Sequence, residues 1–116
     1  MSVRERAGTN GISGNATLRT LTNGTVLNVV DEGDGAPIVL MHGWTADVHF
    51  WDDLAPRLVA DGWRVIRFDL RGHGRTALPT ETEGRNSWDG LADDLLALMA
   101  ALDVRGAVLS GHSMGG

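Results

Sequence analysis

A serine enclosed by glycines stands at the end of the sequence, in the run Gly111, His112, Ser113, Met114, Gly115, Gly116. The spacing Gly111-x-Ser113-x-Gly115 is that of a nucleophile elbow, a strand-to-helix turn so sharp that small residues must flank the serine. Glycine permits a strained backbone that a side chain would block. The apolar run 106–110 leads into the motif, as an elbow requires. We therefore predict that Ser113 is a nucleophile presented at the edge of a sheet.

A serine hydroxyl is a weak nucleophile at neutral pH, so it needs a base, an acid that orients the base, and donors for the oxyanion formed on attack. The amide of Met114, directly after the serine, is the first expected donor. The second is expected from the loop that follows the apolar run 38–41 and begins His42-Gly43-Trp44. Gly43 would let the backbone approach the substrate, and the Trp44 amide would be the donor. The Trp44 ring could also line the acyl pocket.

The four histidines do not supply the base in an obvious way. His112 adjoins the serine, and neighbours in a sharp turn point apart, so it is a poor base. His42 and His73 are expected to structure their loops through hydrogen bonds, and His49 to lie at the surface or rim. Because no set of histidines has ligand spacing and the chain has no cysteine, the sequence predicts neither a metal nor a cofactor.

Other charged and aromatic residues are expected to have structural roles. Asp69 and Arg71 would hold a glycine-rich loop in shape. Trp51 and Trp88 fit apolar helical stripes and are predicted to lie in the core. Two acidic pairs are expected on polar helix faces, without a metal: Asp52-Asp53 and Asp93-Asp94.

Hydrophobic periodicity predicts an alternation of strands and helices. Apolar alternation around Asn23-Gly24 indicates a β-hairpin. A helix is expected to start near Asp52 or Asp53, which places Pro56 in its first turn, and a second to start at a capping box of Asn86 and Asp89. The expected strands are 17–21, 25–30, 38–41, 64–68 and 106–110.

This element order predicts an α/β fold in which an antiparallel hairpin leads into a parallel sheet with helices on both faces. Residues 1–16 are rich in Gly, Ser, Asn and charge and are expected to form a disordered leader. No repeat or linker divides the rest, so residues 17–116 are expected to belong to a single domain.

The composition narrows the class of protein. A net charge of −5 and a pI near 5.1 disfavour a nucleic acid or an anionic membrane as partner. The N-terminus has no apolar core of signal-peptide type, and no apolar run has the length of a membrane span. We therefore expect a soluble, cytoplasmic protein.

Three segments together resemble the serine members of the α/β-hydrolase superfamily: Met41–Trp44, Phe68–Thr76 and Gly111–Gly116. They occur in the family's order, at spacings that fit the third, fourth and fifth strands of its fold. The similarity covers residues 17–116. It is strongest to the branch that holds small esterases, 3-oxoadipate enol-lactonases and cofactor-free haloperoxidases.

The resemblance implies a triad in the order Ser, Asp or Glu, then His, so the acid and the His would lie beyond Gly116. The chain would then be the N-terminal portion of the fold, truncated after the elbow and inactive alone. The implied activity is hydrolysis of a small-molecule carboxylic ester, thioester or lactone through an acyl-enzyme on Ser113. Alternatives are acyl transfer, a cofactor-free haloperoxidase or perhydrolase, or non-catalytic ligand binding. Epoxide hydrolases and haloalkane dehalogenases need a carboxylate at the elbow, which Ser113 disfavours.

Overall fold

The computed structural model describes residues 16–76 and 88–115. The elements found there are β1 (Ala16–Thr20), β2 (Val26–Glu32), β3 (Ala36–Met41), the 3₁₀-helix η1 (Val48–Trp51), α1 (Ala55–Ala60), β4 (Trp63–Phe68), α2 (Trp88–Ala101), β5 (Val108–Gly111) and the 3₁₀-helix η2 (Ser113–Gly115).

The strands form one sheet in the order β1-β2-β4-β3-β5. The pairs β1–β2 and β2–β4 are antiparallel, whereas β4–β3 and β3–β5 are parallel. Gly24 closes the hairpin with a φ of +88°, and the Asn23 side chain accepts a hydrogen bond from the Thr25 amide. The predicted α/β fold, with a hairpin leading into a parallel sheet, is confirmed.

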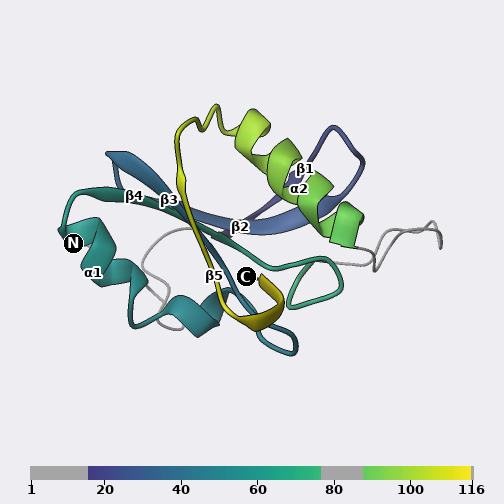
Figure 1. Cartoon of the computed structure of the whole chain (residues 1–116), viewed down its shortest axis with the longest axis horizontal. Helices are drawn as coiled ribbons and strands as arrows, with labels where there is room; N and C mark the ends of the chain where they lie inside the picture. The colour runs from purple at the N-terminus through teal and green to yellow at the C-terminus, as the bar shows by residue number, and fades with distance from the viewer. Residues whose placement is uncertain (1–15, 77–87, 116) are drawn as a thin grey trace.

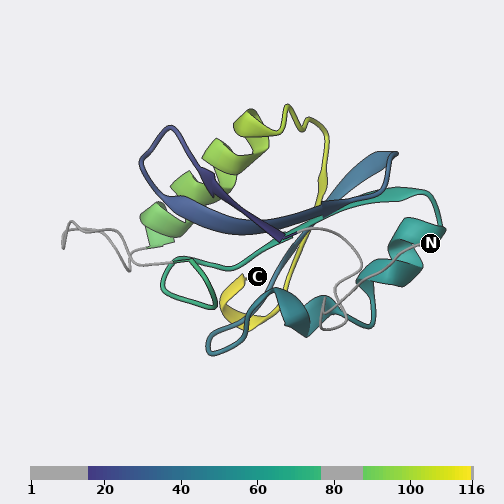
Figure 2. The ribbon, with the colours of Figure 1, turned by 180° about the vertical axis from the view of Figure 1, so that it is seen from behind.

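The two α-helices cover opposite faces of the sheet (Figures 1 and 2). α1 connects β3 to the neighbouring β4, whereas α2 connects β4 to β5 on the other side of β3. The two crossovers run in opposite directions along the sheet. If both are right-handed, as such connections nearly always are, their helices must lie on opposite faces. The loops after the adjacent strands β3 and β4 therefore lead to opposite faces of the sheet, and such a divergence leaves a crevice at the carboxyl ends of the strands.

Side chains of the central strands point alternately to the two faces of the sheet, and apolar residues fill both faces. On β3, Val39 packs toward α2 with Ile66 and Phe68 of β4. Ile38 and Leu40 point the other way, toward α1. A strand buried on both faces reads as a continuous apolar run, which is why the sequence identifies β3 clearly.

The first predicted helix was placed too early. Residues 48–51 form η1, whose N-cap Asp47 accepts a hydrogen bond from the His49 amide, and α1 begins only at Ala55. Pro56 has no amide hydrogen to bond the carbonyl four residues earlier, so an α-helix cannot run continuously from Asp52.

Two predictions about side-chain burial were wrong. Trp88 is 68% exposed, because it stands at the first residue of α2, beyond the apolar cluster beneath that helix. Asp94 is buried, because a guanidinium reaches under the helix to meet it. Trp51 packs against the apolar cluster around Ile38, as expected.

Some predicted features lie outside the described residues. These are the leader up to residue 15, the Asn86 end of the capping box, and Gly116. Ala16, which was assigned to the leader, is the first residue of β1.

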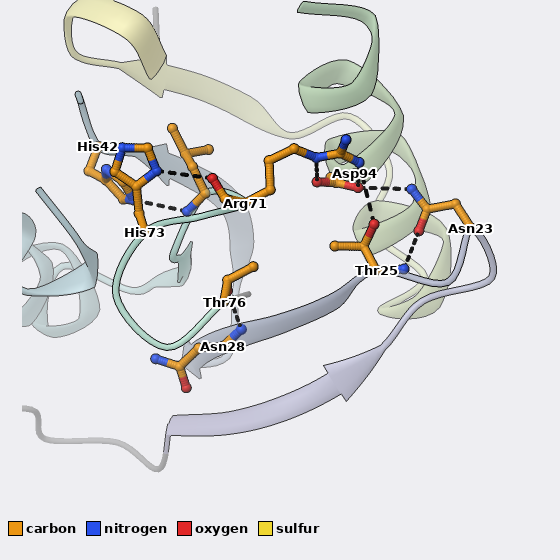
Figure 3. A network of polar contacts seen from close by, with 9 residues as sticks. Asn23, Thr25, Asn28, His42, Arg71, His73, Thr76 and Asp94 are labelled. Carbon is orange, nitrogen blue, oxygen red and sulfur yellow. Dashed lines mark hydrogen bonds and ion pairs between the residues drawn. The ribbon is translucent and has the colours of Figure 1, made fainter. Parts of the chain in front are cut away.

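Asp94 is the centre of a polar network between α2, the β1–β2 hairpin and the loop after β4 (Figure 3). Its carboxylate accepts two hydrogen bonds of 2.8 Å from Arg71 and one of 2.8 Å from Asn23. The hydrogen bonds from Arg71 to Asp94 raise the pKa of that guanidinium. This buried ion pair attaches α2 to a loop far from it in sequence.

We predict that Asp94→Ala lowers the free energy of unfolding by about 3 kcal/mol, because it removes the carboxylate that balances the buried Arg71 charge. The control is Asp93→Ala, at an exposed neighbouring position of the same helix, with an expected change within about 0.5 kcal/mol. Urea unfolding followed by circular dichroism measures both. Equal effects of the two substitutions would contradict a structural role for the pair.

Candidate active site

Ser113 lies where β5 ends and η2 begins, with a backbone φ of +55°. Positive φ is uncommon for a residue with a side chain and is typically retained at functional sites. The strand, the strained serine and the helical turn that follows form the geometry expected of a nucleophile elbow. The Ser113 residue is exposed. Gly111, at the end of β5, pairs with Met41 at the end of β3.

The loop after β3 packs directly on this turn. A Cβ atom on Gly115 would lie 2.5 Å from the carbonyl oxygens of both Met41 and His42. A Cβ on Gly43 would lie 3.1 Å from the His112 carbonyl oxygen and 3.3 Å from the Ser113 Cβ. Both glycines therefore allow the two backbones to approach closely, because a side chain at either position would crowd the other loop.

His42 is fully buried and holds its loop, as predicted. Its Nε2 accepts a hydrogen bond of 2.9 Å from the Leu70 amide, so the ring proton is on Nδ1. Nδ1 donates in turn to the Gly43 carbonyl oxygen, at 2.7 Å. Burial lowers the pKa of His42, outweighing its hydrogen bond to Gly43 and the nearby Asp69 and Asp47, while the neighbouring His73 adds to the lowering.

The Gly43 carbonyl and the Trp44 amide belong to one trans peptide, so they point in opposite directions. Because His42 holds the carbonyl, it also fixes the direction of the Trp44 N–H. Among the described residues this amide has no hydrogen-bond acceptor. Trp44 is 73% exposed, so a small molecule could reach its ring.

The loop after β4 is held by Asp69, as the sequence predicted. Asp69 Oδ2 accepts hydrogen bonds of 2.9 Å from the Arg75 amide and from Asn28 Nδ2. His73 contributes to the same loop through Nδ1, which lies 3.0 Å from the Arg71 carbonyl oxygen (Figure 3). Arg71 itself leaves the loop to meet Asp94, a contact that no spacing in the sequence indicates.

His112 turns toward η1, where its ring centroid lies 4.7 Å from that of Phe50. This position agrees with the expectation that it is not the base. His49 is exposed and contacts Asp52. Among the described residues, no histidine or carboxylate hydrogen-bonds the Ser113 hydroxyl.

A mostly apolar hollow of about 390 Å³ lies between α2 and the carboxyl ends of β3 and β5. Trp88 and Leu109 line it, together with Gly115 of the elbow. The part of the chain that the structure describes contains no cluster of metal-ligating side chains. No described helix combines the length and apolar character needed to cross a membrane.

This chain belongs to the α/β-hydrolase fold family, whose model matches residues 36–116. A non-heme chloroperoxidase of Streptomyces lividans is 42% identical over 99 residues, covering 84% of this chain and 35% of that protein. An esterase of Exiguobacterium antarcticum has a TM-score of 0.78 at 31% identity, over 87% of this chain and 37% of its own. An epoxide hydrolase of Vigna radiata has a TM-score of 0.81 at 26% identity, over 88% and 32%. The chain therefore spans about a third of the length of these relatives.

We predict that the buried, neutral His42 makes stability depend on pH. The unfolded chain takes up a proton near pH 6.5, whereas the folded protein resists it because its His42 pKa is lowered. The His42 contribution to the unfolding free energy is complete above about pH 6.5 and decreases as the pH falls below it.

His42→Gln, whose side-chain oxygen can replace Nε2 as acceptor, should remove this part of the pH dependence. The control His49→Gln changes an exposed histidine and should leave the His42 step in place. Chemical unfolding at several pH values between about pH 5 and pH 8 measures this pH dependence, because the range extends about one and a half units on either side of the unperturbed histidine pKa. An unchanged pH profile in His42→Gln would contradict the assignment.

Proposed function

We propose that Ser113 is the nucleophile of a serine hydrolase that acts on carboxylic esters, thioesters or lactones. The observation that carries the proposal is the positive φ of an exposed serine, seated at the end of β5 against the Gly43 backbone. Strain of this kind costs about 1–3 kcal/mol and persists where the surrounding structure imposes it. A carboxylate nucleophile, which epoxide hydrolysis in this fold would need, is not at this position.

In the proposed reaction, the Ser113 oxygen attacks the carbonyl carbon while a histidine base takes its proton. The amides of Trp44 and Met114 stabilise the oxyanion of the tetrahedral intermediate. The intermediate collapses, the leaving alcohol or thiol takes the proton, and an acyl-enzyme remains. Water, deprotonated by the same base, then attacks the acyl carbon; the bond to Ser113 breaks, the base returns the proton to the Ser113 oxygen, and the acid is released. The base and its acidic partner are expected in the region that the relatives have beyond this match.

A second candidate is oxidative. The similarity to a non-heme chloroperoxidase favours an acyl-enzyme that is cleaved by hydrogen peroxide instead of water, which would release a peracid. The same Ser113 and the same oxyanion donors would serve both reactions. The ratio of acid to peracid formed in the presence of peroxide separates the two functions.

In the full-length protein that contains these residues, Ser113→Ala should lower kcat for a chromogenic ester by on the order of 10⁴-fold or more. It should also abolish labelling by a fluorophosphonate, which reacts with activated serines. Ser110→Ala, three residues earlier in β5, is the matched control and should retain both. Turnover of the ester by Ser113→Ala would disprove the assignment.

The Trp44 donor should act through its backbone. Gly43→Ala places a Cβ against His112 and Ser113 and displaces the Gly43–Trp44 peptide, so we expect a loss on the order of a hundredfold in kcat. Trp44→Phe keeps the amide and an aromatic ring, so its loss should be far smaller. Steady-state kinetics of the two folded variants decides. A larger loss in Trp44→Phe would assign the catalytic contribution to the indole ring.

A further inference from the structure

Val48, the first residue of η1, has both backbone polar groups held by side chains from the end of β4. Its amide donates to Asp69 Oδ1 at 2.7 Å, and its carbonyl accepts from Arg67 Nη1 at 3.0 Å. Residues 67 and 69 are two apart on an extended chain, so both side chains point to the same face of the sheet. Val48 and both of its partners are buried. The start of η1 is therefore fixed to the sheet.

The Asp69 carboxylate joins three segments. Besides the Val48 amide, it accepts the Arg75 amide from the loop after β4 and the Asn28 side chain from β2. Gly74 lies so close that a Cβ there would overlap the carboxylate. Three N–H donors offset the cost of burying a carboxylate that is only 1% exposed.

The segment from Gly43 to Val48 is short and constrained at both ends. At its start, His42 holds the Gly43 carbonyl, and the Ala46 amide closes a turn on the same oxygen at 3.2 Å. Thr45 has a φ of +67°, a conformation that surrounding contacts must maintain. At its end, the Val48 amide is attached to Asp69. The Trp44 amide therefore lies in a short segment whose two ends are fixed by hydrogen bonds.

We propose that Asp69 is a positioning residue: through the Val48 amide, it holds the Trp44 amide in place for the oxyanion formed at Ser113. The inference rests on the proposed function of Ser113. Asp69 does not touch the substrate in this proposal. Its effect is on the rate of the chemical step. Displacing the donor weakens its interaction with the transition state more than its interaction with the bound substrate.

Asp69→Asn tests the proposal in the full-length protein that contains these residues. The amide side chain has the same shape, but its NH₂ group must face an N–H donor in either orientation. We expect kcat to fall by about 10- to 100-fold, with KM changed by less than about threefold. Affinity for a trifluoromethyl ketone, which forms a tetrahedral adduct with an activated serine, should fall by the same factor as kcat.

Asp94→Asn is the matched control. Asp94 is as buried as Asp69 and likewise accepts three hydrogen bonds, in its case from Arg71 and Asn23, but it contacts no residue of the segment 42–48. It should lose stability while keeping kcat within about threefold. Hydrogen exchange of the Val48 amide should accelerate in Asp69→Asn and not in Asp94→Asn.

Val48→Pro keeps the Asp69 carboxylate and removes the amide donor that binds it, so it tests the contact even if Asp69→Asn does not fold. Proline is tolerated at the first position of a helix, and the preceding Asp47 is already extended. It should lower kcat and adduct affinity as Asp69→Asn does. Wild-type kcat in folded Val48→Pro, or an equal loss of kcat in Asp94→Asn, would overturn the proposal.

The two proposals fail in different ways. If the wild-type protein neither hydrolyses esters nor takes the fluorophosphonate label, the function proposed for Ser113 is wrong, and the catalytic role of Asp69 is wrong with it. If the wild-type protein is active and labelled but Asp69→Asn has normal kcat and adduct affinity, only the positioning role is wrong, even if Val48 exchange accelerates.

Discussion

The close contact between the elbow after β5 and the loop after β3 is the constraint on which the site depends. Parallel pairing of β3 with β5 brings the two loops to the same edge of the sheet. At Gly115, there is no room for a Cβ against the carbonyls of Met41 and His42. The strained Ser113 is therefore held from one side by β5 and from the other by the β3 loop. The two loops approach this closely because Gly43 and Gly115 have no side chain at the contact.

Residues at the end of β4 hold the loop after β3 in place for its contact with the elbow. Alternation along the strand sends Phe68 into the core beneath α2 and the charged neighbours Arg67 and Asp69 toward η1. Buried charges are costly, yet here each guanidinium or carboxylate satisfies backbone groups that irregular loops would otherwise leave unpaired. Beyond the strand, Arg71 turns to α2 and Asp94. One short segment thus connects the loop after β3, the loop after β4 and helix α2 to the sheet.

The relatives show how much chemistry this part of the fold can serve. A chloroperoxidase, an esterase and an epoxide hydrolase are similar to this chain over the region, although their names indicate different activities. In this chain the region contains a sharp turn at Ser113 beside the glycine-containing loop after β3. Such a frame determines where a reacting atom lies, while the residue at the turn and the rest of the pocket determine the reaction.

The sequence by itself predicted the order of the strands and helices, the hairpin at Asn23-Gly24 and the elbow at Ser113, because periodicity and glycine positions are local signals. It did not predict that Asp94 is buried or that Trp88 is exposed, since helical periodicity does not reveal which partner a side chain meets. The anchoring of Val48 by Asp69 spans 21 residues, so no local pattern contains it. Tertiary structure alone decided these contacts, because folding brings together donors and acceptors that are far apart along the chain.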